Sequence, residues 1–480
     1  MRHPTVRFWA LALFILLPAA GAQELTPREK EMLDLIEALK ERVTALEETV
    51  ERLEAAPTAP PETPTDTPAK SQPTTAPAPE PAAPNDLRVY WDSGLNFESR
   101  DGQFELSIGG RLHHDWYWFD HRHGRFALPD QEDGTDFRRA RIDISGTLYE
   151  NLSFEFDLDF EDGDASFKDV FLELNHLPLV QNLRAGHFRE PFSLNELESS
   201  NDITFMERAL PNVLAPSRNA GVMLHGAWLG EPGKARLTGA AGIFRATDDF
   251  GFDASDGGYS GTVRVTGLPW YAADGRRLIH LGAAYTHRNP EGLLQLAQAP
   301  ESGGADDLLD TGEFNADRVR ATALEAALVY GPLSLQGEYL WSDIDANRPG
   351  DGNVDGYYLQ ASYLLTGEHR AYKHGAGVLG GITPHRNFRL HGQNRGWGAF
   401  ELALRYSHLD LNASRTDLWS RVWYGDTAIR GGEASNLTLG LNWYLNPDTR
   451  VMLNWVRSDI ERGIRDEELD ILQTRFQIGF

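Results

Sequence analysis

Residues 435–480 read SNLTLGLNWYLNPDTRVMLNWVRSDIERGIRDEELDILQTRFQIGF. Apolar and polar residues alternate here for long runs: Leu437, Leu439 and Leu441 share one parity, and polar or small residues occupy the other. Asn446-Pro447-Asp448 interrupts the first run, and a second begins at Val451. A period of two predicts β-strands that have one apolar and one polar face and are separated by a tight turn.

The chain ends on an aromatic residue. Phe480 shares one face of the last predicted strand with Ile478 and Phe476, whereas Gln477 and Arg475 lie on the other face. This ending is typical of the closing strand of an outer-membrane β-barrel, in which the apolar face meets lipid and the polar face meets the water inside.

Upstream of this stretch the same alternation continues as a succession of strands. The predicted strands are Gln103–Phe119, Asp136–Tyr149, Leu152–Glu161, Phe167–Asn175, Val180–Phe188, Asn219–Leu229, Lys234–Ala246, Gly257–Gly267, Arg277–His287, Val319–Tyr330, Leu333–Trp341, Asn353–Leu365, Trp397–His408, Ala434–Leu445, Arg450–Arg457 and Asp470–Phe480. Short turns such as Glu150-Asn151 alternate with long acidic or glycine-rich loops such as 289–317. We therefore expect an all-β protein, a 16-stranded antiparallel transmembrane barrel wide enough to hold water.

Composition agrees with a barrel and excludes several other classes. The 480 residues include no cysteine, carry a formal net charge of −26 and contain no run of 18 apolar residues. A helical membrane protein is thereby excluded, whereas a barrel is not, because its lipid-facing surface uses only alternate residues. The absence of cysteine suits an exported protein without disulfides. The acidity argues against a nucleic-acid partner, which requires a basic face.

The first 85 residues predict three segments that precede the barrel at 86–480. Residues 1–22 have the form of a signal peptide, with Arg2 and Arg7, an apolar core at 8–17 and the cleavage site Ala20-Gly21-Ala22. Residues 56–85 form a linker with ten prolines, which is semi-extended and has no packed core.

Residues 23–55 between them predict a coiled coil. The apolar heptad positions are Leu25, Met32, Leu39, Leu46 and Leu53, with Ile36, Val43 and Val50 at the other core position. A lone amphipathic helix is the alternative, because four heptads are marginal by themselves. A barrel with an even number of strands keeps both termini in the periplasm, so we expect this N-terminal segment there.

Several motifs resemble one family of porins. They are Phe137-Arg138-Arg139-Ala140-Arg141, GHFREPFSL (186–194), LTGEHRAYK (365–373), GWGAFELALRYS (396–407) and LGLNWYLNP (439–447). Together they resemble the phosphate-selective porin O/P family over roughly residues 86–480. The resemblance implies a trimeric channel of the Gram-negative cell outer membrane whose arginine-lined pore passes phosphate and other small anions.

Strand parity indicates which arginines face the interior. Outward-facing Ala140 and Ile142 place Arg139 and Arg141 inside. The same argument selects further candidate channel-lining residues: Arg264, Arg405 and Arg475. A guanidinium remains charged at all working pH values and offers five donors to phosphate oxygens, as an anion filter requires. The alternative is that these arginines pair with carboxylates inside the barrel and only brace its wall.

The segment from Arg189 to Arg218 is too long for a hairpin turn. The resemblance implies that it folds into the barrel as the constriction loop, to which it brings Arg189, Arg208 and Arg218. The segment also carries five acidic residues, which are Glu190, Glu196, Glu198, Asp202 and Glu207, so its balance is 3 − 5 = −2. Either these carboxylates orient the arginines, or the channel prefers cations.

No catalytic motif, cofactor site or metal site is predicted. We therefore expect a passive channel for phosphate or other small anions, with outer-membrane lipid around it and a homotrimer as its assembly. One alternative is a general or cation-preferring porin. Another is a tether that contacts the cell wall or a periplasmic partner through the coiled coil.

Overall fold

The computed structural model describes residues 87–123, 131–253, 258–290, 292–348, 351–392, 395–414 and 427–480. The predicted signal peptide, coiled coil and linker lie outside the described residues. Within these ranges, no helix has both the length and the apolar character needed to cross a membrane.

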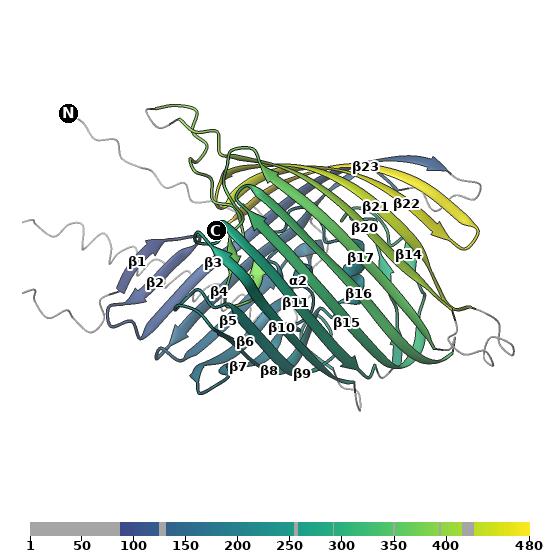
Figure 1. Cartoon of the computed structure of the whole chain (residues 1–480), viewed down its shortest axis with the longest axis horizontal. Coiled ribbons are helices and arrows are strands. Elements are labelled where there is room, and N and C mark those ends of the chain that lie inside the picture. The colour runs from purple at the N-terminus through teal and green to yellow at the C-terminus, as the bar shows by residue number, and fades with distance from the viewer. Residues whose placement is uncertain are drawn as a thin grey trace, which may run out of the picture. The chain divides into compact units, whose positions relative to one another are not determined.

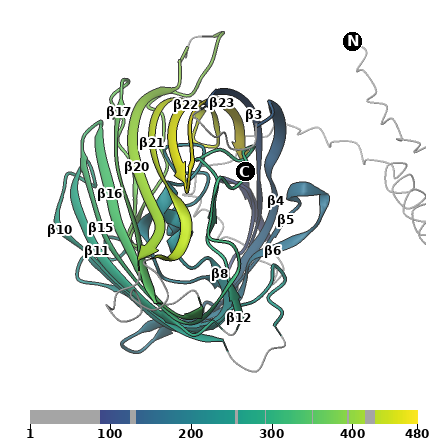
Figure 2. The ribbon, with the colours of Figure 1, turned by 90° about the vertical axis from the view of Figure 1, so that its right-hand side faces the viewer.

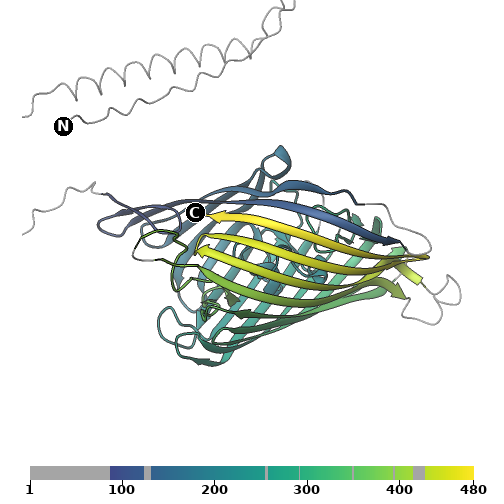
Figure 3. The ribbon, with the colours of Figure 1, turned by 90° about the horizontal axis from the view of Figure 1, so that it is seen from above.

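Sixteen strands close into one antiparallel barrel. They are β3 (Phe104–His123), β4 (Gly134–Leu148), β5 (Leu152–Asp159), β6 (Ser166–Leu177), β7 (Gln181–Arg189), β8 (Arg218–Trp228), β9 (Leu237–Arg245), β10 (Tyr259–Ala272), β11 (Arg277–Arg288), β15 (Phe314–Tyr330), β16 (Leu333–Arg348), β17 (Gly352–Leu364), β20 (Ala399–Ser414), β21 (Thr427–Asn446), β22 (Thr449–Arg462) and β23 (Arg465–Gly479). The last strand pairs with the first, so that the yellow β23 lies beside the blue β3 in Figure 3. Each predicted strand coincides with one of these, and the predicted fold class is confirmed.

The alternation that predicted the strands separates the two faces of the wall. Leu437, Leu439 and Leu441 are 39%, 47% and 40% exposed on the outside, whereas their neighbours Thr438 and Asn442 are buried inside. Apolar side chains on the outer face and polar ones within are the arrangement of a membrane barrel.

The remaining elements are short. The strands are β1 (Leu87–Trp91), β2 (Leu95–Ser99), β12 (Gly292–Leu294), β13 (Ala297–Gln298), β14 (Leu309–Asp310), β18 (Tyr372–Lys373) and β19 (Val378–Leu379); the helices are α2 (Leu194–Leu197) and the 3-10 turns η1 (Glu161–Gly163) and η2 (Leu210–Leu214). The β1–β2 hairpin continues the wall by pairing β2 with the start of β3.

The barrel has two rims. The terminal rim holds the first residue of β3 and the last residue of β23, and the opposite rim holds the other ends of these strands. Three long connections contact the interior. The predicted constriction loop (189–218, whose first and last residues also belong to β7 and β8; hereafter the constriction loop) and the second inner loop (289–313) start from the opposite rim, and the inner hairpin (365–398) starts from the terminal rim. Figures 1 and 2 show chain inside the ring of strands.

An apolar core lies between these loops and the wall near the opposite rim. Leu210 and Leu214 of η2 and Leu309 of the second inner loop pack against inward-facing residues of the last strands, such as Ile460 and Ile471. Ile460 and Ile471 face inward, as do polar residues further along β22 and β23. The inner face of the wall is therefore apolar near the opposite rim and polar near the terminal rim.

Candidate functional site

The constriction loop is held against the far wall of the barrel. The carboxylate of Glu338 on β16 accepts hydrogen bonds from the backbone N–H groups of Leu194 and Asn195, at 2.9 and 2.7 Å. Further along the loop, Arg450 on β22 donates to the carbonyl oxygen of Ile203 at 2.8 Å. The loop therefore leaves the wall at β7, reaches the wall opposite and returns to β8.

Local geometry turns the loop into α2 at its start. Ser193 adopts a positive φ of 64°, and its hydroxyl accepts a hydrogen bond from the N–H of Glu196, which caps the helix. This turn brings Glu196 between two loop arginines. Its carboxylate lies 3.3 Å from Arg189 and 3.3 Å from Arg208.

Three of the predicted lining arginines form ion pairs deep inside the barrel. Arg264 pairs with Glu325 at 2.7 Å, Arg405 with Glu301 at 2.6 Å, and Arg475 with Asp115 at 2.6 Å. Each also donates to a backbone carbonyl of an inner segment: those of Gly377, Glu207 and Met206. With side chains only 0–4% exposed, they brace the inner segments, and a direct role in lining the path stays a prediction.

Arg139 and Arg141 lie on the inner face of β4, and each has N–H donors that make no hydrogen bond within the described residues. The nearest carboxylate to Arg139 is that of Glu207, 4.0 Å away, and the Nε and Nη1 atoms of Arg139 have no hydrogen-bond partner among the described residues. Arg141 donates from Nε to Asp159 at 2.7 Å, while its Nη1 has no hydrogen-bond acceptor within the same set. Both side chains are 6% exposed.

The loop arginines remain more accessible than the bracing ones. The side chains of Arg189, Arg208 and Arg218 are 13%, 14% and 12% exposed. Arg218 pairs with Asp169 at 2.7 Å, yet its Nε, like that of Arg189, has no hydrogen-bond partner in the described part of the chain. Carboxylates thus fix one edge of each guanidinium, which is the orienting arrangement that the loop composition left open.

Two carboxyl groups of the loop sit in opposite electrostatic environments. Burial raises the pKa of Glu198 to about 7, against which its hydrogen bonds with Gln336 and Asn195 act only weakly. Burial also acts to raise the pKa of Glu207, but Arg138 and Arg475 outweigh it and hold that pKa below its ordinary value. At neutral pH the loop therefore carries a fixed negative charge at Glu207 and a titrating group at Glu198.

We expect ion selectivity to change with pH through Glu198. With its pKa raised from 4.5 to about 7, Glu198 is neutral below this value and negative above it, and the folded state loses stability as pH rises through this window. The ratio of chloride to potassium permeability should fall between about pH 6 and about pH 8, and Glu198→Gln should remove the change. Zero-current potentials at the two pH values measure it; an unaltered pH dependence in the variant would assign it to another group.

Two cavities lie on either side of the loop. The outer cavity, about 430 Å³, is near the opposite rim and is lined by Arg138, Arg139 and Arg208 and by the second inner loop. The inner cavity, about 520 Å³, is near the terminal rim and is lined by Arg184, Arg189, β5–β9 and the inner hairpin. Arg208 and Arg189, which share Glu196, thus line different cavities, and their role as the constriction stays a prediction.

The sequence analysis missed several inward-facing arginines, among them Arg450, Arg184 and Arg111. Arg184 on β7 lines the inner cavity, and Arg111 on β3 donates to Ser200 of the constriction loop at 3.2 Å. Parity could have found both, because Arg184 lies between outward-facing Leu183 and Ala185, and Arg111 precedes outward-facing Leu112.

Comparison with known proteins places this architecture in a family. The family model described as phosphate-selective porin O and P matches residues 106–480. Porin O of Pseudomonas aeruginosa is 25% identical over 429 residues, which are 82% of this chain and 93% of that protein. An uncharacterized protein of Caulobacter vibrioides is 25% identical over 427 residues, which are 84% of this chain and 80% of that protein.

Solved structures of porins are also similar. The anion-selective porin from Comamonas acidovorans has 14% sequence identity and a TM-score of 0.47, covering 78% of this chain and 100% of that one. The outer membrane channel DcaP of Acinetobacter baumannii has 9% identity and a TM-score of 0.47, covering 80% and 99%.

The family model spans the barrel from within β3 to the last residue, and the resemblance seen in the motifs is thereby confirmed. The chain belongs to the phosphate-selective porin O and P family and is a channel of the Gram-negative outer membrane, not an enzyme.

Proposed function

We propose that phosphate or other small anions cross the barrel passively through the outer cavity, the constriction and the inner cavity. The observation that carries this proposal is a group of inward-facing guanidinium groups with donor atoms that make no hydrogen bond within the described residues. They are Arg139, which lines the outer cavity, Arg189, which lines the inner cavity, and Arg141 and Arg218. A buried donor without a partner costs free energy, and an anionic oxygen that binds there recovers it. Arginine suits this role, because its fork of donors matches the oxygens of phosphate.

The neighbouring carboxylates favour passage over tight binding. Glu196 serves both Arg189 and Arg208, and Asp169 holds Arg218, so each cation is partly neutralised. A site that conducts must bind an ion strongly enough to admit it and weakly enough to release it. Partial neutralisation meets both conditions.

We propose a homotrimer as the assembly and a periplasmic position for residues 23–85. Support for the second point is that β1 begins beside the terminal rim, the rim that faces the periplasm in barrels with an even number of strands. Any contact of the predicted coiled coil with the cell wall belongs to the same proposal.

The test is the zero-current potential of the purified protein in a planar bilayer under a KCl gradient, followed by titration with phosphate. We expect a zero-current potential of the sign that chloride selectivity produces. We also expect phosphate to block the chloride current. A zero-current potential of the sign that potassium selectivity produces would replace the proposal with a cation-preferring porin, the second candidate. The formal charge of −2 on the constriction loop favours this candidate.

A further inference from the structure

The inner cavity contains a cationic group held flat against an aromatic ring. The guanidinium carbon of Arg184 lies 3.8 Å from the centroid of the Phe171 ring. Glu173 accepts a hydrogen bond from Arg184 at 2.5 Å and contacts His225 at 3.0 Å. Arg184 is therefore fixed in orientation, yet its side chain is 25% exposed and can bind a further anionic group.

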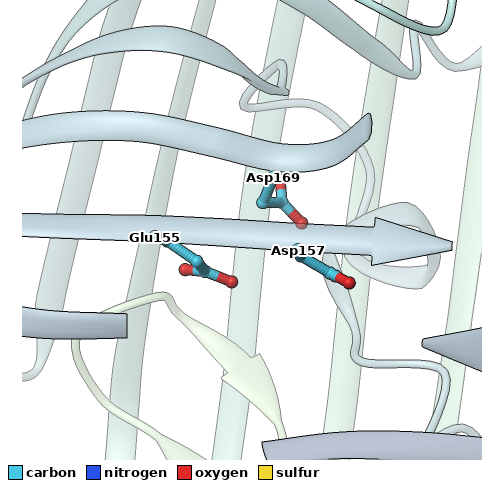
Figure 4. A group of neighbouring side chains, drawn as sticks. All are labelled: Glu155, Asp157 and Asp169. Carbon is cyan, nitrogen blue, oxygen red and sulfur yellow. The ribbon is translucent and has the colours of Figure 1, made fainter. Parts of the chain in front are cut away.

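A cluster of three carboxylates lies beside this pair. Glu155 and Asp157 on β5 and Asp169 on β6 each place an oxygen within 4.8 Å of the others, as Figure 4 shows for their side chains. Asp169 pairs with Arg218 at 2.7 Å, and Asp157 lies 3.7 Å from Arg141. Because like charges so close repel one another, the cluster favours an additional cation.

Two observations indicate where that cation binds. Glu155 forms no ion pair or side-chain hydrogen bond with the residues that the structure describes. Asp157 is only 2% exposed, and its Oδ1 atom lacks a hydrogen-bond partner within the same residues. Both acceptors are on β5, and Glu155 is the one of the two that lines the inner cavity.

The anionic and cationic groups flank one ring. Glu155 and Phe171 are direct cross-strand partners, and Glu173, two residues after Phe171, is the partner of Arg184. All four residues line the inner cavity, together with apolar Met223, Leu197 and Pro191. The cavity thus presents the carboxylate of Glu155 and the guanidinium of Arg184 beside an apolar lining, with the buried Phe171 ring supporting the guanidinium from below.

We propose that the inner cavity binds small zwitterions that carry an apolar group, the chemical class of the apolar amino acids. The ammonium group would lie at Glu155, the anionic group at Arg184 and the apolar group against Leu197, Pro191 and Met223. This inference rests on the proposed function, because the anionic group must first pass the arginines of the outer cavity and the constriction. A simple anion fits less well, because Glu155 repels it, and a divalent ion fits less well, because Arg141 and Arg218 already neutralise two of the carboxylates.

The experiment compares four blockers of chloride current in a planar bilayer. The blockers are phenylalanine, 3-phenylpropionate (which lacks the ammonium group), phenethylammonium (which lacks the carboxylate) and alanine (which lacks the ring). We expect phenylalanine to block at a concentration roughly tenfold below that of each of the others, because each lost contact contributes about one factor of ten.

Two variants assign the contacts. Glu155→Gln removes a group without a protein partner, so it should leave folding intact and raise the blocking concentration of phenylalanine about tenfold while leaving that of 3-phenylpropionate unchanged. Leu197→Asn, which makes the apolar lining polar, should abolish the advantage of phenylalanine over alanine. Glu132→Gln, at an exposed position near the opposite rim, is the matched control and should change nothing.

Equal block by phenylalanine and 3-phenylpropionate in the unmodified channel would overturn the proposal, as would a Glu155→Gln channel that still prefers phenylalanine. Block by calcium that Glu155→Gln abolishes, without any preference for phenylalanine, would replace the zwitterion with a divalent cation. The zero-current potential in KCl, recorded in the same bilayers, shows separately whether the proposed anion function has failed.

Discussion

Replacing Arg139 with glutamine raises the phosphate concentration that halves the chloride current by about tenfold or more. Arg139 has two donor atoms without hydrogen-bond partners among the described residues, and the closest carboxylate is 4.0 Å away. Its charge is therefore available to a passing anion rather than consumed by the protein. A hydrogen bond to a charged group contributes about 1.5–3 kcal/mol, and each 1.4 kcal/mol is a factor of ten.

The control for this prediction is Arg465→Gln, which makes the same chemical change at an exposed residue on β23. The control channel should keep the phosphate sensitivity of the unmodified protein, and both variants should have the same midpoint of unfolding in guanidinium chloride. If phosphate blocks the Arg139→Gln channel as strongly as the parent, Arg139 does not bind the permeating anion.

Glu301→Ala should lower the free energy of unfolding by about 3–5 kcal/mol and increase the single-channel conductance. Glu301 lies in the second inner loop, is 2% exposed and pairs with Arg405 at 2.6 Å. It also accepts hydrogen bonds from the hydroxyls of Ser407 and Thr438 and from the N–H of Leu210. Without the carboxylate, the charge of Arg405 stays buried and unpaired, and the second inner loop keeps only its remaining attachments to the wall, such as the hydrogen bonds from Gln473 and Arg462.

Chemical unfolding in detergent and single-channel recording measure the two parts of this prediction. Glu301→Gln keeps one oxygen acceptor and should fall between the parent and the alanine variant. Glu313→Ala, an exposed residue close to the start of β15, should leave stability and conductance unchanged. A stable Glu301→Ala protein with parental conductance would mean that the apolar contacts of the second inner loop and its hydrogen bonds with Gln473 and Arg462 are sufficient to hold it.

The strands could be predicted because alternation is a local property. Each strand of the barrel contacts only its neighbours, and a two-residue period fixes which side chains face outward. The parity of Leu437 and Leu439 therefore identified both the element and its outer face. The ends of the strands were less accurate: β21 begins at Thr427, before the predicted Ala434, because strand pairing continues beyond the apolar stretch.

The partners of the arginines could not be predicted, because they come from distant segments. Arg475 donates to Met206, and Arg405 pairs with Glu301. Parity says that these side chains point inward but not what they meet there. Parity also predicted a polar interior throughout, whereas part of the interior is apolar. Leu469 and Ile471 face inward like Arg475, but they pack in the apolar core.

The pairing of β23 with β3 also removes the last unpaired strand edges of the barrel. Phe480 exchanges two backbone hydrogen bonds with Gly110, at 2.6 and 2.9 Å, so closure of the ring depends on this strand. A barrel without β23 would have two open edges at once, on β3 and on β22, and unpaired edges associate with other chains. Loss of β23 alone would thus turn a closed channel into an open sheet that is prone to aggregation.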